Sequence, residues 1–151
     1  MLTTQEQYQL MFTISRKYNA LKRYFEEFGN IASSKLQGDS CQVKGIKINL
    51  NLDKNFFDVS FASHTIRFIF SVKINTDRSI AGIVNYIAID TLNEKTIREN
   101  NIRLGKFTFD ENSKTDFIYK PENVPFDIDD SNAVPYIIFH CLYESMARES
   151  L

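Results

Sequence analysis

Apolar residues in the first 28 positions recur every three or four residues, which is the stripe of a helix with one buried face. Thr3 or Thr4 can cap the start of this helix, with Glu6 or Gln7 three residues on to complete a capping box. Gly29, followed by an asparagine, is a natural left-handed stop. The pattern therefore predicts a helix over residues 5–28, with Leu10, Ile14, Tyr18, Leu21, Phe25 and Phe28 on its buried face.

After a serine-rich connection, apolar and polar residues alternate, and this period of two is typical of strands with one buried face. Three such segments follow one another, separated by a turn at 53–55 and by a short link at Ser63 and His64. Consecutive strands with short links form an antiparallel meander. The residues predicted to face the core are Ile46, Ile48, Leu50 and Leu52, then Phe57, Val59 and Phe61, and then Ile66, Phe68, Phe70, Val72 and Ile74.

The segment from Ile80 to Asp90 is apolar on both sides of the alternation. This pattern is typical of a strand at the centre of a sheet that is covered on both faces. Further on, Thr96–Leu104 is compatible with an edge strand, although a helical turn at Leu92–Lys95 is an alternative start. A clearer hairpin is expected from Lys106–Asp110 and Thr115–Lys120.

Pro121 and Pro125 frame a loop that precedes a second helix. The cap of this helix is expected within residues 130–132, at an aspartate, a serine or an asparagine. Pro135 falls in the first turn, where the missing N–H has no helical partner to lose. The predicted buried face consists of Val134, Ile138, Cys141, Leu142 and Ser145.

The order of elements is helix, strands, helix, and it indicates a single α+β domain over residues 1–151. We expect a mainly antiparallel meander sheet of six or seven strands, flanked by an N-terminal and a C-terminal helix. Helices usually cover one face of such a sheet, which leaves the other face to water, to a partner or to a second subunit.

Thirteen Phe and seven Tyr without any Trp give a core of large flat side chains. These rings either pack against one another or line a cavity between sheet and helices in which a ligand sits. A formal net charge of −1 and a pI near 6.1 give no long-range field that would gather nucleic acid or anionic membrane. Nucleic acid is therefore disfavoured as a partner.

The chain has two cysteines, Cys41 and Cys141, and its start shows no signal-peptide pattern. These features favour a cytoplasmic location, where a disulfide between the two is disfavoured and both thiols act as small buried apolar groups. No stretch approaches the roughly 20 apolar residues of a spanning helix, so no membrane contact is expected.

Both histidines are candidates for ligand contact. Adjacent His140 and Cys141 cannot share a ligand on a helix, because consecutive side chains diverge by about 100°. His140 and Glu144 lie on one face, but a zinc site needs further ligands, so a surface hydrogen-bonded pair is favoured. His64 forms a catalytic dyad only if the fold brings it beside Cys141 or Asp58. No catalytic residue is therefore assigned.

Acidic residues before the second helix resemble the start of a calcium loop, with Asp127, Asp129 and Asp130 at alternate or adjacent positions. Asn132 stands where the sharp turn needs Gly, and Ile138 where the bidentate Glu belongs, so helix capping is favoured. The five glycines are scattered, which excludes the glycine-rich phosphate loops. Neither a metal nor a cofactor is expected.

The first predicted helix carries a basic patch, and acidic residues concentrate between positions 110 and 130. A solvated surface is the simpler interpretation of such charges. The same polarity can also steer a charged protein partner, with an effect on association rate more than on affinity. The candidate partner contacts are Arg16 and Arg23 in the basic patch and Asp116 and Glu122 in the acidic stretch.

Two functions are consistent with this sequence. The first is a non-catalytic protein-binding domain of inhibitor, immunity, chaperone or adaptor type, which presents an exposed sheet face or an edge strand to a protein partner or a second copy. The second is a small-ligand-binding protein or cryptic enzyme with an aromatic-lined cavity, contacted by His64, His140 and Tyr143. The absence of a catalytic motif favours the first.

Overall fold

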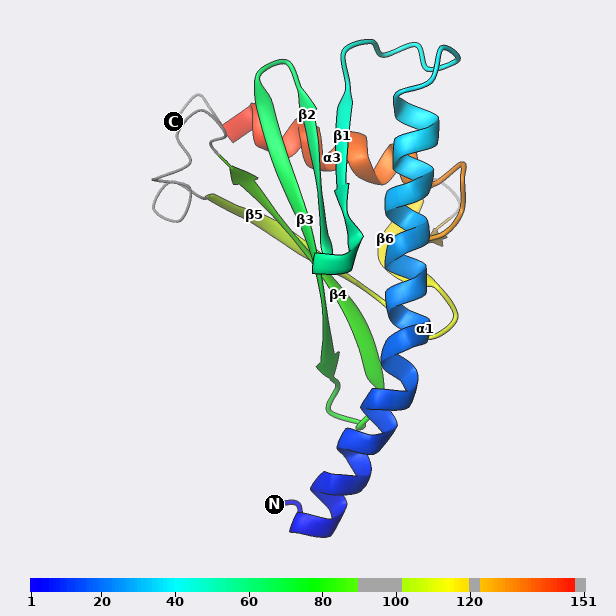
Figure 1. Cartoon of the computed structure of the whole chain (residues 1–151), viewed down its shortest axis with the longest axis vertical. Helices are drawn as coiled ribbons and strands as arrows, with labels where there is room; N and C mark the ends of the chain where they lie inside the picture. The colour runs from blue at the N-terminus through cyan, green and yellow to red at the C-terminus, as the bar shows by residue number, and fades with distance from the viewer. Residues whose placement is uncertain (90–101, 120–122, 149–151) are drawn as a thin grey trace.

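The computed structural model describes residues 1–89, 102–119 and 123–148. These residues form two α-helices and a seven-stranded antiparallel meander, in the order that the sequence pattern predicts (Figure 1). Each strand pairs with its neighbours in chain order, from β1 at one edge to β7 at the other. The elements are α1 (Thr4–Leu36), β1 (Lys47–Asn51), the short turn η1 (Leu52–Lys54), β2 (Phe56–Phe61), β3 (His64–Ile74), β4 (Ile80–Ile89), β5 (Ile102–Phe109), β6 (Lys114–Tyr119), β7 (Val124–Asp127) and α3 (Val134–Ala147).

The start of α1 is confirmed and its predicted end is wrong. A capping box joins Thr3 and Glu6: Thr3 Oγ1 accepts from the Glu6 N–H at 3.1 Å, and Glu6 Oε2 accepts from the Thr3 N–H at 3.2 Å. The helix then continues through Gly29 to Leu36. A Cβ at Gly29 would lie 3.1 Å from the Leu52 side chain, so this glycine allows helix and sheet to approach closely and does not stop the helix.

The hairpin between β2 and β3 turns one residue earlier than predicted. Ala62 and Ser63 form the turn with φ values of 52° and 67°, as in the two-residue turns that match the twist of a hairpin. His64 is therefore the first residue of β3 and pairs with Phe61. The predicted core-facing residues of both strands keep their side of the sheet, because side chains alternate whichever residues make the turn.

β4 lies inside the sheet, but the expectation that both its faces are covered is wrong. Val84 and Tyr86 are buried under the helices, whereas Ile83 and Ile87 on the other side are partly exposed. The predicted edge strand over 96–104 is also wrong where the structure describes it, because residues 102–104 begin β5, which pairs with β4 within the sheet. The alternative helical turn at 92–95 lies outside the described residues.

Two predictions near the C-terminus need correction. Pro125 lies in β7 and not in a loop, because an edge strand tolerates a residue that has no N–H to donate. The N-cap of α3 is Ala133, which has no side-chain cap; Asp130 Oδ1 instead accepts from the Asn132 N–H at 2.9 Å in the preceding turn. The predicted buried face of α3 is confirmed, with Ile137 added to it.

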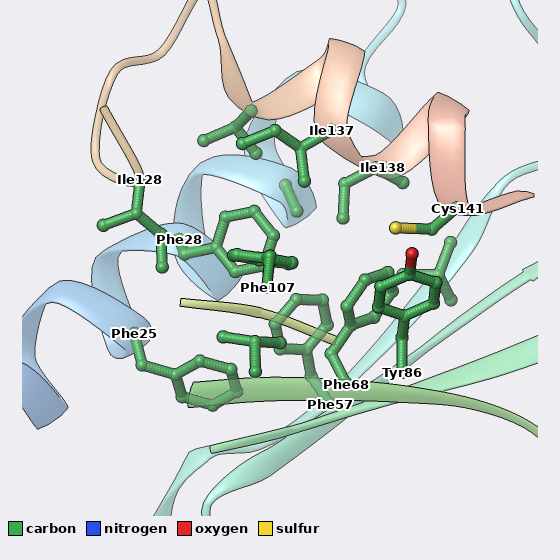
Figure 2. Packing of buried hydrophobic residues seen from close by; sticks show 14 of the residues in the cluster. Phe25, Phe28, Phe57, Phe68, Tyr86, Phe107, Ile128, Ile137, Ile138 and Cys141 are labelled. Carbon is green, nitrogen blue, oxygen red and sulfur yellow. The ribbon is translucent and has the colours of Figure 1, made fainter. Parts of the chain in front are cut away.

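The core lies between the sheet and the two helices, which pack on the same face (Figure 2). Phe28 of α1 contacts rings of three strands, with centroid distances of 5.4 Å to Phe57, 5.9 Å to Phe68 and 5.8 Å to Phe107. Edge-on and offset contacts at this range are the favourable geometries of aromatic pairs. Six phenylalanines of the core are fully buried, and all but Phe109, which stacks on Phe70, contact another of the six: Phe25, Phe28, Phe57, Phe68, Phe107 and Phe109.

Candidate functional site

An apolar centre lies on the sheet face opposite the helices. Phe56 of β2 pairs directly with Ile69 of β3, and Ile69 pairs with Asn85 of β4. Ile83 and Ile87 flank Asn85 on the same side of β4, and all five side chains are partly exposed. Eight residues of this side form a surface that we call the open face: Phe56, Asp58, Arg67, Ile69, Ile83, Asn85, Ile87 and Arg103.

A charged pair is fixed beside this apolar centre. Arg67 lies opposite Asp58 across β2 and β3 and donates to it twice, from Nε at 2.9 Å and from Nη2 at 3.1 Å. The guanidinium carbon also lies 4.1 Å from the centre of the Phe56 ring, within the range of a cation–π contact. The hydrogen bond that Arg67 donates to Asp58 raises the pKa of Arg67, so its guanidinium stays charged. Both side chains are held in one geometry before any partner arrives.

A second arginine borders the apolar centre on its other side. Arg103 of β5 pairs with Ile87, which pairs in turn with Arg67, so Ile87 lies between two guanidinium groups. Arg103 is exposed, and its Nη2 donates to Asn85 Oδ1 at 2.9 Å. With two arginines and one aspartate, the eight residues carry one net positive charge, and the exposed Lys106 opposite Asn85 adds a second beside them.

This surface was not predicted, because the outer side of β4 was expected to be covered. The neighbouring strands nevertheless carry a signal for it. Asp58 and Ser60 of β2 and Arg67 of β3 alternate with the residues predicted to face the core, and adjacent strands share their faces. The isoleucines of β4 on that side therefore had to be at least partly outward as well.

The two edges of the sheet are less suited to binding than its open face. At β1 the Ile48 N–H already donates to the side-chain oxygen of Gln37 at 2.8 Å. At the other edge, Pro125 in β7 has no N–H to offer an added strand. Both features blunt an edge against further strand pairing.

The residues predicted to contact a ligand lie on two different elements. His140 and Tyr143 are one turn apart on α3, where Tyr143 is exposed, whereas His64 begins β3. His140 Nε2 lies 2.5 Å from Glu144 Oε1, as a surface pair, and its ring packs edge-on against Phe117 at 5.3 Å. An open hollow of about 310 Å³ is found elsewhere, lined by Lys17, Asn75, Ser79, Ile80, Asp110, Glu111 and Asn112.

The buried thiol of α3 is placed for packing and not for chemistry. Cys141 is fully buried, and burial raises the pKa of its thiol well above the ordinary value. Figure 2 shows the Tyr86 hydroxyl directed toward this thiol, and the same oxygen lies 3.3 and 3.4 Å from the carboxylate oxygens of Glu144. A protonated, enclosed thiol is a poor nucleophile, so a dyad of Cys141 with His64 has no reactive partner.

The predicted partner contacts are spread over several elements. Arg16 and Arg23 are exposed on α1, and the Arg16 guanidinium lies 6.0 Å from the Phe12 ring centre. Asp116 of β6 accepts from the Thr108 N–H at 3.0 Å, and Glu122 lies outside the described residues. Among the described residues, the first helix and the acidic stretch meet at the surface, where Lys17 Nζ lies 2.6 Å from Glu111 Oε1. Part of the expected polarity is therefore used within the chain.

Within residues 1–89, 102–119 and 123–148, no three His, Cys, Asp or Glu side chains gather as a metal ion requires. Asp127, from the calcium-like run, instead pairs with Lys114 Nζ at 2.7 Å. Neither helix in the described part of the chain combines the length and apolar character needed to cross a bilayer. Comparison of the chain with protein-family models, with curated proteins and with solved structures found no match.

Proposed function

We propose that this protein is a non-catalytic protein-binding domain that uses the open face of its sheet. One observation carries the proposal: a partly exposed apolar centre is framed by fixed charged side chains on the face that both described helices leave free. The inhibitor, immunity, chaperone and adaptor classes all act through such a surface. A cytoplasmic location is part of the proposal, supported by two free thiols at Cys41 and Cys141.

The chemistry of the open face resembles that of an interface centre. Aromatic residues and arginine are enriched there, and the residues that dominate binding cluster at the middle and are surrounded by a polar rim. Phe56 and three isoleucines supply the apolar middle, and Arg67 and Arg103 supply the rim. Because Asp58 already holds Arg67 in place, binding orders fewer side chains and loses less entropy.

The dimensions and charge of the open face indicate what binds. Four strands span roughly 20 Å, and the five residues from Ile83 to Ile87 span roughly 15 Å along them. This area of roughly 300 Å² is below what specific interfaces usually bury on each partner, so a partner bound here alone forms a weak, reversible complex. The net positive charge favours a partner whose own apolar patch has an acidic border.

The small-ligand alternative has weaker support. Five of the six fully buried phenylalanines contact one another, and the sixth, Phe109, stacks on Phe70, so these rings occupy the space where an aromatic-lined cavity was expected. The hollow beside Lys17 is lined by none of His64, His140 and Tyr143.

The test is capture from an extract of the native host with tagged full-length protein. Three baits are compared: the wild type, the open-face variant Ile83→Ser with Ile87→Ser, and a control variant, Tyr136→Ser with Tyr143→Ser, which removes two large exposed side chains from α3. We expect one stoichiometric protein on the wild type and the control variant and its loss from the open-face variant. Circular dichroism confirms that all three are folded. Retention on the open-face variant, or no stoichiometric protein on the wild type, would contradict the proposal.

A further inference from the structure

We infer that the outer side of the N-terminal part of α1 binds the same segment of a second copy of this chain, as an antiparallel helix pair. Four exposed residues define this surface, called the outer seam: Gln5, Tyr8, Phe12 and Ser15. Their alternating spacing of three, four and three is that of the a and d positions of a heptad, whose seven-residue repeat forms the seam between two packed helices.

The outer seam lies on the side of α1 that faces away from the sheet. Tyr8 and Phe12 each precede a residue of the core-facing stripe, Leu10 and Ile14, by two positions, so they point about 200° round the helix from it. The Tyr8 and Phe12 side chains are 74% and 58% exposed. Figure 1 shows the first turns of α1, in dark blue, extending past the end of the sheet.

The first turns of α1 extend beyond the hydrophobic core. The first residue of α1 that packs against the core is Ile14, and the first ring contact is made by Tyr18, at 5.7 Å from Phe70. Ten residues of the helix, 4–13, precede Ile14, so the apolar side chains among them are not packed against the core. In most proteins such a segment is stabilised by packing of its apolar side, and here two aromatic rings are available for it.

The charge pattern of α1 favours a second copy as that partner. None of the four seam residues is charged, whereas the same side of the helix further on carries Lys22, Arg23 and Glu26. Identical charged surfaces repel each other, and an uncharged one does not. An antiparallel pair centred on residue 10 places the bordering Arg16, whose guanidinium lies 6.0 Å from the Phe12 ring, beside Thr4 of the second copy, so no like charges meet.

The seam is also complementary to itself. When two copies pair antiparallel about the level of residue 10, position i lies beside position 20 − i. Tyr8 then meets Phe12 of the second copy twice at the centre, and Gln5 meets Ser15 at each end. An aromatic centre with polar pairs at its border is the usual anatomy of an isologous interface, and antiparallel helix dipoles attract.

The arrangement leaves the rest of the molecule free. Each sheet packs on the side of α1 opposite the seam, so the two sheets lie outside the pair and at opposite ends of it. The seam is about 15 Å long at 1.5 Å per residue. An interface of this size is small, and the dimer is therefore expected to dissociate at micromolar concentration.

The first experiment measures mass in solution against concentration for the full chain. The wild type should rise from 17.6 kDa toward twice that value. Phe12→Lys places two charges at the centre of the pair and should remain a monomer throughout. The matched control is Gln7→Lys, an exposed residue on the same helix about 140° round from Phe12, which should behave as the wild type does.

The second experiment tests the orientation of the two helices. In a Cys41→Ser background, Gln5→Cys and Ser15→Cys are oxidised separately and as a mixture. Equal residues of an antiparallel pair are about 15 Å apart, beyond the reach of a disulfide, whereas unlike residues are adjacent. We expect cross-linking in the mixture alone.

Three results would overturn the inference: a wild type that stays monomeric at every concentration, a Phe12→Lys variant that still dimerises, or Gln5→Cys that cross-links by itself. A monomeric wild type whose captured protein is lost by Phe12→Lys would assign the seam to a different protein, which also overturns it. The open-face variant Ile83→Ser with Ile87→Ser should dimerise as the wild type does. Failure of the dimer inference can therefore be distinguished from failure of the proposed function of the open face.

Discussion

Phe56 and Phe57 are neighbours in β2, and they show how differently the two faces of one sheet are stabilised. Phe57 is fully buried and touches the rings of Phe25, Phe28 and Phe68 at 5.0–5.5 Å. Phe56 remains partly exposed, and a guanidinium group held in an ion pair lies over its ring. One face thus gains its stability from burial, while the other keeps an apolar surface available and orders it with a charged pair.

The largest expected effect is the difference in the free energy of unfolding between variants of these two neighbours. Phe57→Ala removes a fully buried ring and should lower the free energy of unfolding by about 3–5 kcal/mol. Phe56→Ala loses a ring that is already partly hydrated and should lower it by about 1 kcal/mol. Urea unfolding of both variants measures the difference. Equal losses would mean that the open face is covered in solution, contrary to the account.

The next effect tests how tightly the covered face is packed. Gly82 of β4 pairs with Phe109 of β5, and a Cβ at Gly82 would lie 2.2 Å from the tip of the Phe109 ring. Because that ring is fully buried and cannot move aside, Gly82→Ala should lower the free energy of unfolding by about 1–3 kcal/mol. Adding Phe109→Leu should recover part of the loss. Strictly additive losses in this cycle would show that the ring and the glycine are not coupled.

On the open face the expected stability effects are smaller. The Arg67 and Asp58 side chains are 27% and 13% exposed, so their two hydrogen bonds are only partly screened. A double-mutant cycle with Arg67→Ala and Asp58→Ala should give a coupling free energy of about 1 kcal/mol. A coupling free energy near zero would mean that Asp58 does not hold Arg67 in place, so the open face would not be ordered in advance for binding.

The smallest expected effect is the change in the free energy of unfolding with pH that the Tyr86 hydroxyl, beside Cys141, causes. Burial raises the pKa of Tyr86 above its ordinary value of 10.0, with the nearby thiol and carboxylate of Cys141 and Glu144 adding to the shift. The folded state therefore keeps this proton when the unfolded state has lost it, so stability is fully present below pH 10.0 and falls as pH rises above it.

Tyr86→Phe removes this dependence. Its free energy of unfolding should be within about 1 kcal/mol of the wild type near neutral pH and should fall less steeply above about pH 10. Urea unfolding at two pH values measures it, and parallel pH profiles would contradict the assigned burial of this hydroxyl.

The alternation of apolar and polar residues predicts on which face of the sheet a side chain lies. It predicts less well which residue of the neighbouring strand lies opposite. A link at Ser63 and His64 would pair Asp58 with Ile69, whereas the turn at Ala62 and Ser63 pairs it with Arg67. Both turn residues have positive φ, a region where Gly or Asn is usual, so no residue marks the turn. The ion pair of the open face could not be found without that register.

Longer-range packing accounts for the other differences. Gly29 has the local features of a helix stop, and only its contact with Phe57 and Leu52, far along the chain, shows why a glycine is needed inside α1. Similarly, the apolar outer side of β4 is compatible with burial, and only the placement of both helices on one face leaves Ile83 and Ile87 at the surface. Neither fact is local to the residues concerned.

Chemical footprinting of the captured complex tests the central claim most directly, because it reports which side chains a partner covers. Labelling is compared between the free protein and the complex. The account predicts protection of Phe56, Ile69, Ile83 and Ile87, with Tyr136 and Tyr143 on α3 labelled equally in both states. Protection confined to α3, with the four open-face residues labelled as in the free protein, would contradict it.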